Sequence, residues 1–247
     1  MSDHHDQALP LVAHLTDLRN RLLRSILAVL LVFICLFPFA NDIYAFVSEP
    51  LRALLPEGSS MIATEVASPF LTPFKLTLFT ALFLAAPVVL YQLWRFVAPG
   101  MYGHEKRLAV PLLGSSVVLF YAGTAFAYFV VFPLVFKFFT SVGPDNIAVM
   151  TDINRYLDFV LKLFFAFGIA FEIPIVAVLL ILTGITSADK LAQKRPYIIV
   201  GCFVLGMILT PPDVISQALL AIPMWLLFES GVFFGRLLQH RGADKAP

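Results

Sequence analysis

The sequence predicts an all-α, polytopic membrane protein with six transmembrane helices. Hydrophobic residues make up 60% of the 247-residue chain and charged residues 13%, and the mean hydropathy is +0.88. Soluble domains average about 45–50% apolar and about 25% charged residues. The apolar runs are too long for membrane-spanning strands and show no alternation of period two. We therefore expect helices, organised as a single transmembrane domain over residues 1–247.

Six apolar runs are candidates for spans, because about 20 apolar residues cross the hydrocarbon core as a helix. They lie at about 22–40, 71–95, 108–136, 157–183, 196–210 and 214–235. The fifth run reaches only about 22 Å at about 1.5 Å per residue, which is less than the ~30 Å core. The run after Asp213 is not much longer. We therefore expect the last two spans to be short helices in a tight hairpin, with a thinned bilayer beside them.

Basic residues gather on one side of these spans. With the N-terminus inside, the inner segments are 1–24, 95–107, 184–195 and 236–247. These segments hold 12 of the 17 Lys and Arg, whereas the outer loops hold only Arg52 and Arg155. The distribution predicts that both termini are cytoplasmic, with 1–21 as the N-terminal segment and 236–247 as the tail. The first twenty residues lack the apolar region of a cleavable signal peptide, so we expect the first span to direct insertion.

Two features of the sequence predict a curved wall of helices with short helices over its outer mouth. The first outer loop, about 41–70, contains apolar pieces of its own, from which we expect short helices lying over the outer mouth. Prolines within the spans remove backbone donors and bend helices. These prolines are Pro87, Pro111, Pro133, Pro174 and Pro223. Bent helices favour a curved wall over a compact bundle.

A polar helix is expected at Leu11–Arg24, ahead of the first span, because its leucines recur at helical spacing. Asp17 lies on a neighbouring face and has two interpretations. It can form an i,i+4 pair with Arg21, or it can accept a guanidinium group from a ligand.

Glu105 lies in the polar loop WRFVAPGMYGHEKR, which separates the second and third runs. It can favour the N-terminus of the third span through the helix dipole. Alternatively, it is a second ligand carboxylate on the inner side, flanked by Phe96 and Tyr102 as stacking surfaces.

Glu172 lies near the middle of the apolar run FFAFGIAFEIPIVAVLL. An acid at that depth costs at least ~2.5–3.5 kcal/mol, so it should face protein or water and be functional. The alternative is an acid satisfied by an internal donor such as a hydroxyl. Met207, Thr210 and Gln217 place polar or soft groups around the expected hairpin, and Glu229 is expected to be structural.

Several chemistries are excluded by the absence of their motifs. HEKRL is not an HExxH zinc helix, because position 108 is Leu. The chain has no GxxxxGK[ST], GxSxG or CxxC motif. Cys35 and Cys202 lie in apolar runs, where we expect both to be small buried hydrophobes. We expect no enzyme activity, no metal and no cofactor. The alternative function is an ion-coupled secondary transporter with Glu172 as its proton or cation site. Such a transporter predicts internal symmetry between the two halves, which the sequence does not show, and one deeply placed acid makes a poor relay.

Eight strings spread along the chain carry a family resemblance: HLTDLRNRLLR, ANDIYAFVSEPL, MIATEVASPF, FVAPGMYGHEKR, FAYFVVFPL, FGIAFEIPI, GITSADKLAQKRPY and LTPPDVISQALLAIPM. In these strings the chain resembles the TatC family, the polytopic core of the twin-arginine protein translocase, in its proteobacterial form. The resemblance implies six helices in a concave, cupped arrangement in the cell inner membrane. It also implies a receptor that binds twin-arginine signal peptides, self-associates, and exports folded proteins with the single-span partners TatA and TatB, driven by the proton gradient. No nucleic acid is implied.

The resemblance also implies roles for individual residues. The signal-peptide surface corresponds to Asp17, Arg19, Phe96 and Glu105. Glu172 corresponds to the intramembrane acid, and Pro50 and Asp213 to outer-side functional positions. Met207, Thr210 and Gln217 correspond to a patch that contacts a partner helix. The family usually has Glu where this chain has Asp17, which keeps the charge on a shorter side chain, and Gly103 stands where a basic residue is common.

Overall fold

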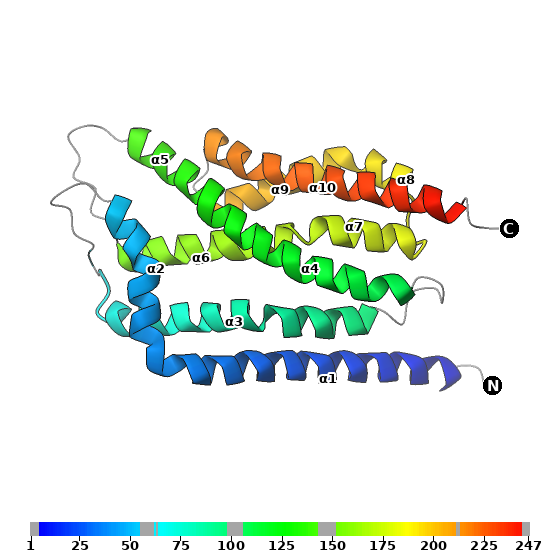
Figure 1. Cartoon of the computed structure of the whole chain (residues 1–247), viewed down its shortest axis with the longest axis horizontal. Coiled ribbons are helices and arrows are strands. Elements are labelled where there is room, and N and C mark those ends of the chain that lie inside the picture. The colour runs from blue at the N-terminus through cyan, green and yellow to red at the C-terminus, as the bar shows by residue number, and fades with distance from the viewer. Residues whose placement is uncertain are drawn as a thin grey trace. The chain divides into compact units, whose positions relative to one another are not determined.

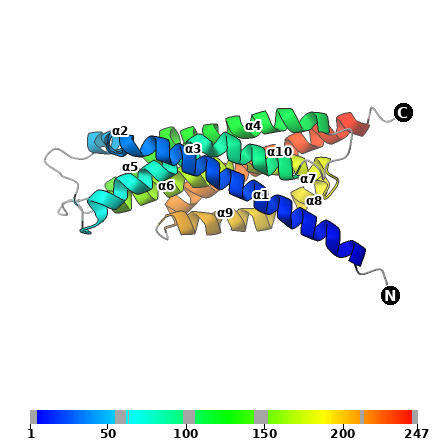
Figure 2. The same cartoon turned by 90° about the horizontal axis from the view of Figure 1, so that it is seen from below.

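The computed structural model describes residues 5–54, 62, 64–97, 106–142, 152–210 and 213–243 (Figures 1 and 2). These residues are almost entirely helical and contain no named strand, which confirms the all-α fold class. The chain divides into two compact units. The first unit comprises Met1–Leu55 and Val66–Met101, and the second comprises Pro56–Glu65 and Tyr102–Pro247. The expected single transmembrane domain stays a prediction.

The first unit is built from three helices: α1 (His5–Leu36), α2 (Ala40–Leu54) and α3 (Ser68–Val97). A short 3₁₀ turn, η1 (Phe37–Phe39), joins α1 to α2. Helices α1 and α3 pack antiparallel, because the His14 and Phe96 rings stack at 4.4 Å while the Phe33 and Phe74 rings lie 5.2 Å apart. Figure 1 shows α2 turning sharply away from α1. The helix expected in the first outer loop is thus present, and its place over an outer mouth stays a prediction.

The second unit contains the remaining helices. They are α4 (Lys106–Phe126), the π segment η3 (Ala127–Val131), α5 (Phe132–Val142), α6 (Ile153–Ala170), α7 (Ile173–Leu182), α8 (Ala188–Gln193), α9 (Arg195–Leu209) and α10 (Val214–Ala243). Helix α10 packs against α7, α8 and α9, and α4 packs against α6. Figure 1 shows α9 and α10 side by side.

Two of the expected proline effects appear as changes of helix type. Pro133 is the second residue of α5, and α5 begins directly after the π segment. Pro174 is the second residue of α7, after a turn at Phe171–Glu172 that ends α6. A proline ring cannot continue the hydrogen bonding of the preceding turn, so the helix widens or breaks ahead of it. The helices run on through Pro87, Pro111 and Pro223.

The six predicted runs all fall in helices. Among the described residues, five helical segments are long and apolar enough to cross a membrane: His14–Val47, Ser68–Phe96, Val110–Phe138, Ile153–Leu182 and Val214–Gln239. The remaining run forms α9, which has only 15 residues, as expected of a short span. The expectation that its partner is also short is wrong, since α10 has 30 residues. Helix α10 continues past residue 235, and there Arg236 pairs with Asp189 of α8 at 2.9 Å.

A small residue allows α4 to approach α6 closely. A Cβ atom added to Gly123 would lie 2.5 Å from the carbonyl oxygen of Phe167 and 2.8 Å from the Phe171 ring. Small residues at such crossings bring helix backbones together in membranes. This crossing positions the α6–α7 break, which carries Glu172, beside α4.

Candidate functional site

The N-terminal polar segment is part of α1, and Asp17 forms the expected pair there. The Arg21 Nε donates to the Asp17 Oδ2 at 2.7 Å, one helical turn away. The Asp17 side chain still exposes 43% of its surface, whereas Arg21 exposes 13%. Asp17 is therefore an accessible carboxylate that already has one guanidinium partner.

The other residues expected on the signal-peptide surface lie at the same end of the first unit. Arg19 is exposed on α1. Phe96, in the last turn of α3, stacks on His14 with an angle of 25° between the rings. Asp17, Arg19 and Phe96 are thus on two helices that pack together at this end. Glu105 lies outside the described residues, so its place beside Asp17 stays a prediction.

Glu172 lies in the turn between α6 and α7, next to α4. The Ser116 hydroxyl donates to the Glu172 Oε2 at 2.5 Å, and Ser116 is completely buried. The Glu172 Oε1 is buried and has no hydrogen-bond partner among the residues that the structure describes. An internal hydroxyl therefore satisfies one oxygen, as the second interpretation expected, while the other oxygen can still accept a donor.

The residues expected around the hairpin are split between two environments. Thr210 is buried, and its hydroxyl donates to the Gly206 carbonyl at 2.9 Å. Gly206 lies close to the backbone of Gln217, since an added Cβ would meet the Gln217 carbonyl oxygen at 3.3 Å. Met207, by contrast, is 51% exposed on α9. Thr210 and Gln217 thus lie together at the α9–α10 junction, and Met207 presents its thioether at the surface.

The two residues expected on the outer side, Asp213 and Pro50, lie before α10 and within α2. Asp213 precedes α10, and its Oδ1 accepts from the Ser216 backbone N–H at 2.7 Å, which caps the helix. Its Oδ2 is buried without a partner. Pro50 lies within α2, and its side chain lies outside the described part of the chain.

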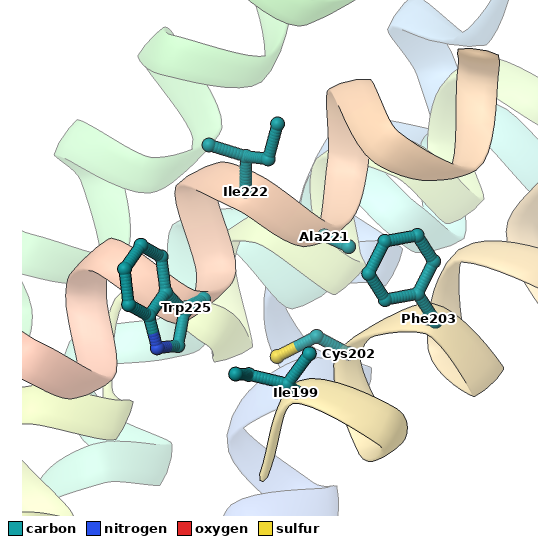
Figure 3. Close-up of a pocket in the computed structure, with 6 residues that line it drawn as sticks. All are labelled: Ile199, Cys202, Phe203, Ala221, Ile222 and Trp225. Carbon is teal, nitrogen blue, oxygen red and sulfur yellow. The ribbon is translucent and has the colours of Figure 1, made fainter. Parts of the chain in front are cut away.

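An apolar pocket opens between α9 and α10 (Figure 3). Its volume is about 160 Å³, and Cys202 on its wall is buried. The pocket is lined by Ile199, Cys202, Phe203, Ala221, Ile222 and Trp225. Cys202 is thus the small buried hydrophobe expected from the sequence. Cys35, in α1, is exposed on the helix surface, so the expectation that it is buried is wrong.

Two polar contacts were not anticipated from the sequence. Glu229 on α10 accepts two hydrogen bonds from Arg195 at the start of α9, at 2.5 and 2.8 Å. On the expected outer side, Asp152 accepts from the Thr64 hydroxyl and from the Thr64 backbone N–H at 3.2 Å. The Thr64 hydroxyl, with the Arg155 backbone N–H, lowers the pKa of Asp152 from 3.8 to about 2. Both contacts join residues far apart in sequence, so local pattern gave no signal for them.

Comparisons with known proteins agree with one another. The family model described as Sec-independent protein translocase protein (TatC) matches residues 13–223. A TatC protein from Azotobacter chroococcum is 69% identical over 236 residues, which cover 96% of this chain and 92% of that protein. One from Escherichia coli K12 is 59% identical over the same shares of the two chains.

A solved structure titled as the twin-arginine translocase receptor TatC has a TM-score of 0.82 and 42% identity, covering 91% of this chain and 98% of that chain. The likeness therefore spans both units and nearly the full length of each protein compared. The chain belongs to the TatC family of Sec-independent protein translocase proteins.

Proposed function

We propose that this protein is the receptor subunit of a twin-arginine translocase in the cell inner membrane. In this proposal it binds twin-arginine signal peptides at its cytoplasmic face and exports folded proteins with TatA and TatB, using the proton gradient. The observation that carries the proposal is the solved twin-arginine translocase receptor, which aligns with 91% of this chain at a TM-score of 0.82. The uneven distribution of Lys and Arg supports cytoplasmic termini.

Arginine recognition follows from the chemistry of the expected surface. A guanidinium group can donate two parallel hydrogen bonds to a carboxylate, and the ammonium group of Lys cannot reproduce that geometry. Asp17 is exposed enough to receive such a group, although Arg21 already donates to one of its oxygens. An incoming arginine therefore shares Asp17 with Arg21 or displaces it, and Glu105 is proposed as the second carboxylate. Phe96 and Arg19 complete this surface.

The intramembrane groups are proposed to contact partner helices. The unpartnered Oε1 of Glu172 can accept a hydrogen bond from a polar side chain within the bilayer. Met207 is exposed beside Thr210 and Gln217, which gives α9 a soft, accessible contact next to a polar junction. Pro50 and Asp213 are assigned to the outer side, where Asp213 fixes the start of α10.

The alternative, an ion-coupled secondary transporter using Glu172, has no observation in its favour. The matching proteins are named as translocase components. Within the described residues, no group of three or more His, Cys, Asp or Glu side chains could hold a metal ion.

The test is export of a folded twin-arginine reporter in cells that depend on this protein. We expect Glu105→Ala and Asp17→Ala to reduce export strongly while the protein still accumulates in the membrane. Asp189→Ala is the matched control, because Asp189 is 84% exposed and lies outside the proposed surface.

A photo-crosslinking probe beside Glu105 should also label a signal peptide, and the label should disappear when its two arginines become lysines. Normal export by both site variants, or equal labelling of the arginine and lysine peptides, contradicts the receptor proposal.

A further inference from the structure

An apolar groove runs between α1 and α3 in the first unit. Its walls include Leu22, Ile26 and Leu30 from α1 and Leu78, Leu82 and Val89 from α3. The groove has a volume of about 360 Å³. The one hydroxyl on its wall, that of Ser25, donates to the Arg21 carbonyl at 3.0 Å and is thereby satisfied. Water gains no partners in such a space, so the groove is suited to hydrocarbon.

The length of the groove matches one leaflet of a bilayer. Leu22 and Leu30 are eight residues apart, which is about 12 Å along a helix, and half of the hydrocarbon core is about 15 Å. Past Leu30, the next turn is occupied by a cluster of three rings. Phe33 lies 5.2 Å from Phe74 and 5.7 Å from Phe37 between ring centroids. The cluster ends the groove near mid-depth, so the groove is long enough for one acyl chain and too short for a spanning helix.

Positive charge lies at the open end of the groove. Arg19 precedes Leu22, Ile26 and Leu30 at helical spacing, so it shares their face of α1, and it is exposed. Between Asp17 and Arg24 the helix carries one acid and three arginines. Asp17 is paired with Arg21, whose Nη1 is buried without an acceptor. Among the described residues of α1, this end of the groove therefore carries more cations than anions.

We propose that this groove binds one anionic phospholipid, with an acyl chain between α1 and α3 and the phosphate at Arg19. Basic groups at the inner membrane surface attract anionic headgroups and gain nothing comparable from zwitterionic ones. The lipid site shares Arg19 with the proposed signal-peptide surface, but it needs neither Glu105 nor a partner subunit.

Native mass spectrometry of the purified full-length protein tests the site. Phosphatidylglycerol and phosphatidylcholine with identical acyl chains are added in separate titrations. We expect one phosphatidylglycerol to be retained preferentially, and Arg19→Gln to weaken its binding about fivefold, as one basic residue contributes at such a surface. Arg155→Gln, which removes an exposed charge from the second unit, should leave the binding unchanged.

A pair of adjacent substitutions tests the position of the acyl chain. Ile26 lines the groove and Leu27 does not, yet both side chains are 54% exposed. Ile26→Trp should fill the groove and abolish the preferential binding, whereas Leu27→Trp should not. Equal retention of the two lipids by the wild-type protein, or equal loss in the two Trp variants, overturns the proposal. So does a crosslink from position 26 to a single-span subunit that is unchanged by added phosphatidylglycerol.

Discussion

Ser116 and Glu172 are joined by a 2.5 Å hydrogen bond that connects α4 to the break between α6 and α7. The bond gives an acid within an apolar span one internal donor, while its second oxygen stays buried and unpartnered. A buried carboxyl without hydrogen bonds is strongly unfavourable. Ser116 therefore both lowers the cost of placing Glu172 at this depth and fixes which oxygen faces away from α4.

The first prediction concerns Ser116→Ala. Removing the hydroxyl leaves Glu172 without its donor, so we expect the unfolding free energy to fall by about 1–3 kcal/mol, the usual effect of stranding a buried polar group. Export should fall as well, because the carboxyl is no longer held in one orientation. Thermal unfolding in detergent and reporter export measure the two effects.

Ser115→Ala is the matched control for this prediction. Ser115 is the neighbouring residue and its side chain is exposed, whereas Ser116 is completely buried. The control should leave the midpoint of unfolding and the export rate unchanged. Equal behaviour of the two variants would show that the hydrogen bond to Glu172 contributes nothing.

The second prediction concerns the crossing of α4 and α6. Gly123→Ala places a Cβ 2.5 Å from the Phe167 carbonyl oxygen, so the helices must separate. We expect a loss of about 1–3 kcal/mol in unfolding free energy, as for other overpacked interiors. Gly114→Ala on the same helix is the control, because nothing lies within 4 Å of its added Cβ.

Ala is a better helix former than Gly by about 1 kcal/mol, so Gly114→Ala should be neutral or slightly stabilising. Unfolding midpoints of the two variants, measured in the same detergent, decide the question. A midpoint for Gly123→Ala at or above that of Gly114→Ala would contradict the close crossing.

The third prediction compares two ion pairs of the second unit. Arg195 donates two hydrogen bonds to Glu229, which is 25% exposed. Arg195→Lys loses the two-point geometry, so we expect it to lower the unfolding free energy by more than Asp189→Asn does. The Arg236–Asp189 pair exposes 45% and 84% of its side chains, and Asp189→Asn should cost less than about 0.5 kcal/mol.

Unfolding midpoints at low and high salt measure this contrast. Salt screens the exposed pair more than the partly buried one, so the small effect of Asp189→Asn should vanish at high salt. An Asp189→Asn effect as large as that of Arg195→Lys would show that the two hydrogen bonds from Arg195 add nothing.

The sequence predicts most of the helices because their signals are local. Runs of apolar residues locate the spans, Pro133 and Pro174 mark the changes of helix type, and the spacing of Asp17 and Arg21 predicts their pair. The Ser116–Glu172 contact is different. A hydroxyl partner for Glu172 is a reasonable expectation, but 56 residues separate the two, and only the packing of α4 on α6 distinguishes Ser116 from Ser115.

The length of α10 and the cap at Asp213 show two further limits. Apolar composition located the end of the run near residue 235, yet a helix can continue past its apolar run where a polar contact such as Arg236–Asp189 holds it. Asp213 accepts from the Ser216 backbone N–H, as an N-cap residue does. From the sequence, Asp213 had only the functional role that the family resemblance implies, and the cap was not anticipated.

The fourth prediction concerns pH at the Thr64–Asp152 contact. The Thr64 hydroxyl holds the pKa of Asp152 at about 2, and an unfolded Asp has a value near 3.9. The folded value is the lower one, so the contact stabilises the fold fully above about pH 4 and is lost as the pH falls towards 2. Between pH 5 and 8 the contact should be insensitive to pH, because Asp152 is ionised in both the folded and the unfolded chain.

Amide hydrogen exchange at Ile153 measures this contact, since its N–H donates to the Ile62 carbonyl oxygen at 3.1 Å. We expect protection of this amide, relative to amides in the middle of α6, to fall on acidification from pH 4 to 2. Thr64→Val removes the hydroxyl at nearly constant volume, so it should reduce the protection at neutral pH and move its loss towards pH 4. Conversely, if Thr64→Val leaves both the protection and its pH dependence unchanged, the Thr64 hydroxyl does not hold residue 62 against the start of α6.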